Sequence, residues 1–160
     1  MIIYRYIKKV IKFYKANKYL KKYKPRGCSL DEICKLEKEL GFKLPAAYIE
    51  YLRWAGKDYQ GLFIGSDAFI DDVLENNEAL EETLLERKFE HFDQKPYVCF
   101  FCHQGYVFKW FYQTDNEDDP ICYEYAEMID GIKFGVSGKF SDVLFKKISD
   151  NIDCINRLNS

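Results

Sequence analysis

The sequence has few of the residues and motifs on which catalytic and metal sites depend. Only two of its 160 residues are histidines, His91 and His103, and neither lies in a nucleophile motif. The chain also lacks a phosphate-binding glycine loop, a G-x-S-x-G elbow and an H-E-x-x-H zinc motif. These absences argue against the common nucleotide-binding and hydrolytic enzymes. We therefore predict that the protein is not an enzyme and uses no cofactor or metal ion.

Long hydrophobic runs are absent as well. The longest unbroken apolar run covers residues 97–102, far short of the roughly 20 residues that a membrane span needs. The N-terminus lacks the hydrophobic core of a secretory signal. Six cysteines are spread through predicted helices and strands rather than framing loops. We therefore expect reduced thiols and a cytoplasmic location.

Charge is distributed unevenly along the chain. The first 26 residues hold ten of the 24 Lys and Arg and neither Asp nor Glu. The other 134 residues hold 14 basic and 26 acidic residues, a net charge of −12, although the whole chain is close to neutral at −2. An acidic body attracts a basic partner and speeds encounter. We expect a protein partner and no direct binding of nucleic acid.

A basic amphipathic helix is predicted for residues 2–24, with Ile7 and Val10 on its apolar face. Three interpretations are open for it. It docks on the domain with its lysines in water, it lies on a membrane surface or nucleic acid, or it is a mitochondrial presequence. A proline and a glycine end the segment, which divides the chain into a helix at 1–26 and a domain at 27–160.

Two short helices are predicted between residues 29 and 56. Ser29 and Glu32 have the spacing of a capping box at the start of the first helix. Gly41 is placed to end it as a left-handed C-cap, and Pro45 suits the first turn of the second helix. About four residues join the two helices, so we expect them to pack as a hairpin.

A strand is predicted for residues 58–65 and a helix for residues 70–90. Apolar residues such as Leu80 and Leu84 are spaced for one face of this helix. An asparagine pair at 76–77 is the point at which the helix can divide into two pieces.

The clearest β-hairpin covers residues 97–112. A Gln104-Gly105 turn joins its strands, and in that register His103 pairs with Tyr106. Both faces of the hairpin are largely apolar, which predicts a place at the centre of the sheet.

A second hairpin and a final helix complete the fold. Lys109 is expected near a rim of the first hairpin, and residues 121–136 form the second hairpin around an Asp130-Gly131 turn. Ser141 is predicted to cap the last helix. The sequence thus predicts a single α+β domain, with a mixed or antiparallel central sheet of about five to six strands flanked by helices.

Cys99, Cys102 and His103 match the C-x-x-C-H pattern of haem attachment. We reject a haem because residues three apart on a strand point to opposite faces, and no export signal is present. His103 is expected to pack against Tyr106 and to form a hydrogen bond at the end of the hairpin.

Two acidic segments are candidate partner-binding surfaces. The short loop after the first hairpin lacks the glycine and the distant glutamate of an EF-hand, so it is either a solvated loop or a surface that meets lysine and arginine. The candidate residues are Asp115, Glu117, Asp118 and Asp119 in this loop, and Glu78, Glu81 and Glu82 on the predicted helix at 70–90.

The helical hairpin and the later β-hairpin together resemble the SUKH superfamily, the yeast cell-wall regulator-like domain. The resembling residues are Leu36-Glu37, Leu40-Gly41, Leu44-Pro45, Tyr48, Leu52, Trp54, Gly56, the run 61–65 and the FCHQGYVF of residues 101–108. The resemblance spans roughly residues 29–148. Many members carry Asn-Gly-Gly after the second helix, where this chain has Ala55-Gly56-Lys57.

The resemblance implies an α+β fold and a non-enzymatic role, with no catalytic residues to carry over. Bacterial members resemble immunity proteins, each of which binds and blocks a toxin, often a nuclease. Eukaryotic members act as interaction or scaffold proteins. We therefore expect an immunity protein that occludes a basic toxin. The alternative is a regulatory scaffold that recruits partners or a membrane surface through residues 2–24.

Overall fold

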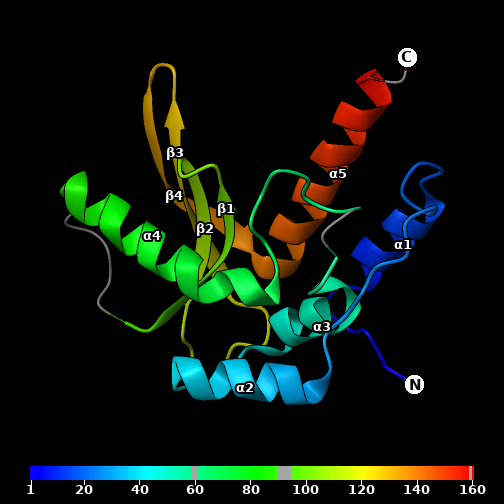
Figure 1. Cartoon of the computed structure of the whole chain (residues 1–160), viewed down its shortest axis with the longest axis horizontal. Helices are drawn as coiled ribbons and strands as arrows, with labels where there is room; N and C mark the ends of the chain where they lie inside the picture. Colours follow the sequence, from blue (N-terminus) through cyan, green and yellow to red (C-terminus); the bar gives the residue numbers. More distant parts are fainter. Residues whose placement is uncertain (59–60, 90–94, 159) are drawn as a thin grey trace.

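The structure is a computed structural model that describes residues 1–58, 61–89, 95–158 and 160. Four strands form one antiparallel sheet in the order β1-β2-β3-β4 (Figure 1). The α+β fold is confirmed, but the described residues form four strands and not the five to six expected. The elements are α1 (Lys8–Ala16), α2 (Leu30–Leu40), α3 (Ala46–Ala55), the 3₁₀ helix η1 (Ile70–Asp72), α4 (Val73–Glu86), β1 (Tyr97–His103), β2 (Val107–Tyr112), β3 (Ile121–Met128), β4 (Gly131–Lys139) and α5 (Phe140–Leu158).

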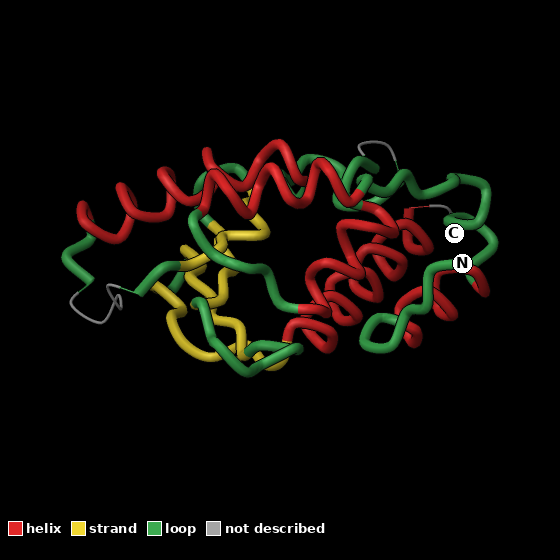
Figure 2. Tube along the Cα trace, turned by 90° about the horizontal axis from the view of Figure 1, so that it is seen from below, coloured by secondary structure: helices red, strands yellow, loops and turns green. Residues whose placement is uncertain are grey.

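Helices cover both faces of the sheet. Leu80 and Leu84 of α4 pack on one face, in a cluster with Phe108 and Trp110 of β2. The other face packs on α3 and α5, where the buried ring of Tyr48 lies between those of Phe111 and Phe140, with centroids 5.3 and 5.4 Å away. Both termini lie on the α1–α5 side of the molecule, away from α4 (Figures 1 and 2).

The N-terminal helix is shorter than predicted and docks on the domain. It covers only Lys8–Ala16, because the side chain of Asn17 accepts hydrogen bonds from the following backbone N–H groups and turns the chain. Its apolar face is buried, and Phe13 contacts Phe145 of α5 at 5.0 Å between centroids. The docked interpretation is therefore confirmed.

A carboxylate of α3 holds the chain just before α1. Glu50 accepts hydrogen bonds from the backbone N–H groups of Arg5, Tyr6 and Ile7 at 2.7, 2.8 and 3.1 Å. Since α1 has no side-chain cap of its own, Glu50 satisfies donors that would otherwise need water.

The predicted helical hairpin is confirmed. Ser29 and Glu32 form both hydrogen bonds of the capping box, and Gly41 has the expected left-handed conformation at φ 81°. Pro45 is the residue before the first turn of α3 rather than within it.

The strand predicted at residues 58–65 is wrong where it can be compared. Residues 59–60 lie outside the described part of the chain, and 61–65 form bends and turns. Phe63 and Gly65 have positive φ values of 54° and 78°, which no extended strand accommodates. Phe63 instead turns inward and packs edge-on against Phe101, with ring centroids 5.8 Å apart.

Helix α4 runs without a break through the asparagine pair. Asn77 reaches the outer edge of β1, where it accepts from the N–H of Cys99 at 2.7 Å and donates to the carbonyl of Tyr97 at 3.2 Å. Asp67 pairs with Cys102 further along the same edge. The asparagines therefore hold α4 to the sheet instead of dividing the helix. The helix ends at Glu86 and not at residue 90, which is not described.

The first β-hairpin forms, but the register predicted for residues 101–103, next to the turn, is wrong by one residue. Gln104 and Gly105 both have positive φ values, 49° and 79°. The turn also includes Tyr106, so His103 pairs with Val107. β1 is also an edge strand rather than a central one.

A bulge in β1 overturns the argument made from the cysteine spacing. Phe100 is an extra residue opposite the junction of Lys109 and Trp110. The bulge places Cys99 and Cys102 in the same cluster under α4, and not on opposite faces.

Candidate functional site

The acidic loop between β2 and β3 is only partly free. Asp115 and Glu117 are exposed. Asp118 accepts a hydrogen bond from the hydroxyl of Tyr6 at 2.8 Å, and Asp119 accepts from the backbone N–H and hydroxyl of Ser141 at 2.9 and 2.6 Å. Two of the four predicted residues therefore fix the loop, and the other two present carboxylates to solvent that form no hydrogen bond or ion pair with the described residues.

These contacts also correct the expected start of the last helix. Ser141 lies inside α5, which begins at Phe140, and Asp119 supplies the side chain that satisfies its N–H. The backbone N–H of Phe140 donates to the carbonyl of Pro120 at 2.9 Å. The β2–β3 loop is thus tied to the first turn of α5.

The second acidic set lies on a helix. Glu78, Glu81 and Glu82 are exposed on α4. Of these, Glu81 approaches another group, the hydroxyl of Tyr97, at 3.5 Å. These residues lie on the helix over one face of the sheet, whereas the acidic loop follows the end of β2.

The cysteine–histidine motif forms no reactive site. Burial raises the pKa of the Cys99 thiol, and burial also raises that of Cys102, so both thiols are protonated at neutral pH. His103 packs edge-on against Tyr106 and its Nδ1 lies 2.8 Å from the hydroxyl of Ser66, which confirms the expected structural role. His91 lies outside the described residues. Within the described ranges no three His, Cys, Asp or Glu side chains are grouped to hold a metal ion.

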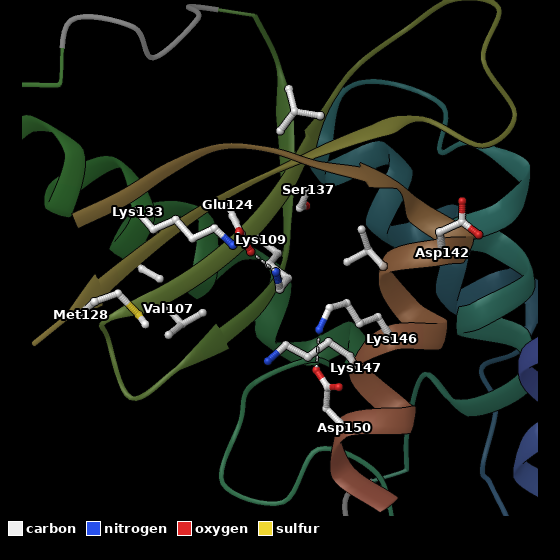
Figure 3. A pocket seen from close by; sticks show the side chains of 13 residues that line it. Val107, Lys109, Glu124, Met128, Lys133, Ser137, Asp142, Lys146, Lys147 and Asp150 are labelled. Carbon is white, nitrogen blue, oxygen red and sulfur yellow. Dashed lines mark hydrogen bonds and ion pairs between the residues drawn. The ribbon is translucent and has the colours of Figure 1, made fainter. Parts of the chain in front are cut away.

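An open cleft of about 590 Å³ lies between the sheet and α5 (Figure 3). Its sheet wall is formed by residues of β2, β3 and β4, and its other wall by α5. It faces away from α4. The sequence did not predict this cleft, because its walls come from four elements that meet only after the sheet has paired.

A buried ion pair forms the floor of the cleft. Lys109 and Glu124 are direct partners on β2 and β3, and both carry a hydrogen-bonded ion pair although their side chains are only 9% and 10% exposed. Lys133 of β4 pairs with the second oxygen of Glu124. Burial alone would raise the pKa of Glu124, but the two lysines outweigh it and lower that pKa. The carboxylate is therefore charged and fully occupied.

The expectation that Lys109 lies near a rim is wrong, since it is one of the buried charged residues of the protein. A signal for the pair did exist in the sequence. A lysine inside an otherwise apolar strand needs a carboxylate partner, and the next predicted strand contains Glu124 among apolar and aromatic residues.

Comparisons with known proteins identify the family. A search of curated proteins gave no significant match. No helix in the described part of the chain is both long and apolar enough to cross a membrane. The sequence model of the SMI1 / KNR4 family (SUKH-1) matches residues 27–146, three quarters of the chain, and so agrees with the resemblance drawn from the residues. The chain therefore belongs to the SMI1 / KNR4 family (SUKH-1).

Proposed function

We propose that this protein is a non-enzymatic immunity protein, which binds a toxin and blocks it. The observation that carries the proposal is the family match over residues 27–146. Members of this family generally bind partner proteins, toxins among them, and are generally not catalysts. We place its action in the cytoplasm, which agrees with six free cysteines in the structure.

The proposed mechanism is occlusion of a basic, nucleic-acid-binding surface on a nuclease toxin. Asp115 and Glu117 are the residues we assign to first contact, because their carboxylates are exposed and are not engaged by any described residue. Asp118 and Asp119 hold the loop in position through Tyr6 and Ser141. The outer carboxylates of α4, Glu78, Glu81 and Glu82, form the second proposed contact surface.

The structure favours this function over membrane recruitment through the basic N-terminal segment. Val10, Ile11 and Tyr14 of α1 are buried against the domain, so the apolar face that an interfacial helix inserts is occupied. The exposed residues of α1 are its four lysines and Ala16. We propose that residues 1–26 are an addition that docks on the family domain.

The test uses a candidate toxin domain, chosen from the proteins that the neighbouring reading frames encode. That domain is expressed in bacteria with and without this chain, and survival is measured as the molar ratio of the two proteins is varied. A protein that acts by binding protects cells only while at least about one copy of it is present for each toxin molecule. Protection at a hundredfold excess of toxin would contradict binding as the mechanism and indicate catalysis.

A charge-reversal variant then tests the loop. Asp115→Lys with Glu117→Lys is expected to lower the association rate about tenfold at low salt, because charges at the rim of an interface act on encounter. Asp118 and Asp119 stay unchanged, which keeps the loop folded. The control, Glu39→Lys with Asp153→Lys, makes the same charge change at exposed positions elsewhere and is expected to have a smaller effect. Equal rates for the two variants would remove the loop from the mechanism.

A further inference from the structure

The cleft beside α5 has features that the proposed acidic contacts do not use. Four lysines and three acidic residues line it, in contrast to the acidic surfaces elsewhere on the domain (Figure 3). The lysines are Lys109, Lys133, Lys146 and Lys147, and the acids are Glu124, Asp142 and Asp150. The balance of the cleft is therefore positive, although residues 27–160 carry a net charge of −12.

The carboxylates near the centre of the cleft are already engaged. Glu124 pairs with both Lys109 and Lys133, and Asp150 pairs with Lys146 at 3.0 Å. Asp142 lies on the first turn of α5, at the end of the cleft away from Lys147 (Figure 3).

Lys147 is the lysine of this cleft that forms no ion pair with a described residue. Its ammonium lies 4.4 Å from the ring centroid of Phe101, a contact with an aromatic face that replaces a carboxylate only in part. Burial lowers the pKa of Lys147, and the charge of Lys109 lowers it further. A partly desolvated cation of this kind gains more from an incoming anion than a fully hydrated surface lysine does.

The opposite wall presents an unsatisfied hydroxyl. Ser137 is the extra residue of a bulge in β4, since Cys122 pairs with Gly138 and Tyr123 with Val136. The bulge directs its side chain into the cleft (Figure 3). Its Oγ is buried and has no hydrogen-bond partner among the described residues. Buried hydroxyls are normally hydrogen-bonded, so this one is suited to an external oxygen.

We propose that the cleft binds an extended, carboxylate-bearing segment of a partner protein, with Lys147 pairing a carboxylate and Ser137 donating its hydroxyl to an oxygen of the same segment. The proposal rests on the proposed function in taking the partner to be a protein. It adds a second, oppositely charged contact surface to the acidic loop.

A peptide fits the cleft better than a nucleic acid does. The lining mixes its charges with apolar side chains such as Val107, Met128 and Val143. A polyphosphate chain would also cross the acidic field of the domain over its whole length. A short segment with one or two carboxylates needs only the local charge of the cleft.

The experiment uses a fluorescent ten-residue peptide that alternates Glu with Ser, and its counterpart that alternates Gln with Ser. Binding is measured by fluorescence anisotropy at low salt. We expect the Glu peptide to bind the full chain and the Gln peptide to bind at least about tenfold more weakly. Lys147→Met is expected to lower the affinity for the Glu peptide about tenfold, Lys147→Arg to restore most of it, and Ser137→Ala to lower it about threefold.

Lys38→Met is the matched control, because it removes the same charge from an exposed position on α2. Amide NMR shifts of the unsubstituted chain give a second readout, which does not depend on the folding of any variant. The Glu peptide is expected to shift residues of β4 and the middle of α5. Equal binding of the two peptides, equal losses in Lys147→Met and Lys38→Met, or shifts confined to residues 115–119 would each overturn the proposal. Tighter binding of a single-stranded oligothymidylate at the same cleft would also overturn it.

The two proposals fail in different ways. If Lys147→Met protects cells from the toxin as well as the unsubstituted chain does, the cleft is not the contact surface while the immunity function stands. If the peptide binds the cleft but the chain gives no protection, the immunity function is wrong while the cleft remains a carboxylate site.

Discussion

The buried pair of Lys109 and Glu124 allows a sharp test of the energetics of this sheet. Replacing Glu124 by Leu leaves the ammonium of Lys109 without its partner, with a side chain that is only 9% exposed. Breaking a buried pair costs about 3–5 kcal/mol, and we expect about 3 kcal/mol here because the cleft admits water. For a chain of this length, that loss lowers the melting temperature by roughly 6–12 °C.

The other single variant is expected to be milder. Lys109→Met leaves Glu124 paired with Lys133, whose side chain is 66% exposed, so we expect a loss of about 1–2 kcal/mol. The double variant Lys109→Met/Glu124→Leu replaces the pair by apolar side chains of similar size and is expected to lie within about 1 kcal/mol of the unsubstituted protein. The pairwise coupling, which is the sum of the two single losses minus the loss in the double variant, is then about 4 kcal/mol.

Urea unfolding of the four proteins measures this cycle directly. The midpoint shifts give the free energies, and equal slopes show that the extent of unfolding is the same. Asp150→Asn serves as the control, since its exposed pair with Lys146 is expected to contribute less than about 0.5 kcal/mol. Additivity of the two single variants within about 0.5 kcal/mol would refute the reasoning.

Three further predictions follow from contacts described above. Because the pKa of Glu124 is lowered in the folded protein, the stabilisation that its charge provides is complete above about pH 4.5 and is lost as the pH falls through the pKa of the folded state. The urea midpoint of the unsubstituted protein is therefore expected to fall between about pH 6 and 3, and that of Glu124→Gln is expected to fall less steeply. Glu50→Gln replaces one of the two oxygens that accept from three backbone N–H groups by an amide NH2, and it is expected to cost about 1–2 kcal/mol, with faster hydrogen exchange in α1 and unchanged exchange in α4. Asn77→Ala removes the hydrogen bonds that Asn77 forms with two backbone groups of β1 and is expected to cost about 2 kcal/mol in urea unfolding, whereas Asn156→Ala, at an exposed position of α5, is expected to change little.

Local signals in the sequence predicted the helical hairpin of α2 and α3 well. The capping box at Ser29 and the left-handed glycine at Gly41 depend on residues within a few positions of each other, so they could be read from the chain. The strand at 58–65 could not be judged in this way, because Phe63 takes a positive φ that its residue type disfavours and its burial against Phe101 requires. The one-residue error in the first hairpin has a similar cause in Gln104, and the bulge at Phe100 has no local signature.

Most of the candidate site could not be predicted from the sequence, because it depends on contacts between residues that are far apart in the chain. The acidic loop was visible as a charged segment, but the engagement of Asp118 depends on Tyr6, 112 residues away, and that of Asp119 on Ser141, 22 residues away. The cleft requires the register of three strands and the position of α5. Lys147 and Ser137 carry no motif, and only folding brings their two walls together.

The contacts that Asn77 and Asp67 make with β1 cover one edge of the sheet, whereas the other edge, at β4, is not covered in this way by the described residues. A strand from another molecule would have to displace α4 to join at β1, whereas the far side of β4 is hydrogen-bonded to no other strand in the described ranges. A strand from a partner protein or from a second copy of this chain can therefore be added to the sheet only beside β4. Self-association that depends on protein concentration should accordingly respond to changes in the exposed residues of β4, such as Val136, and not to changes in β1.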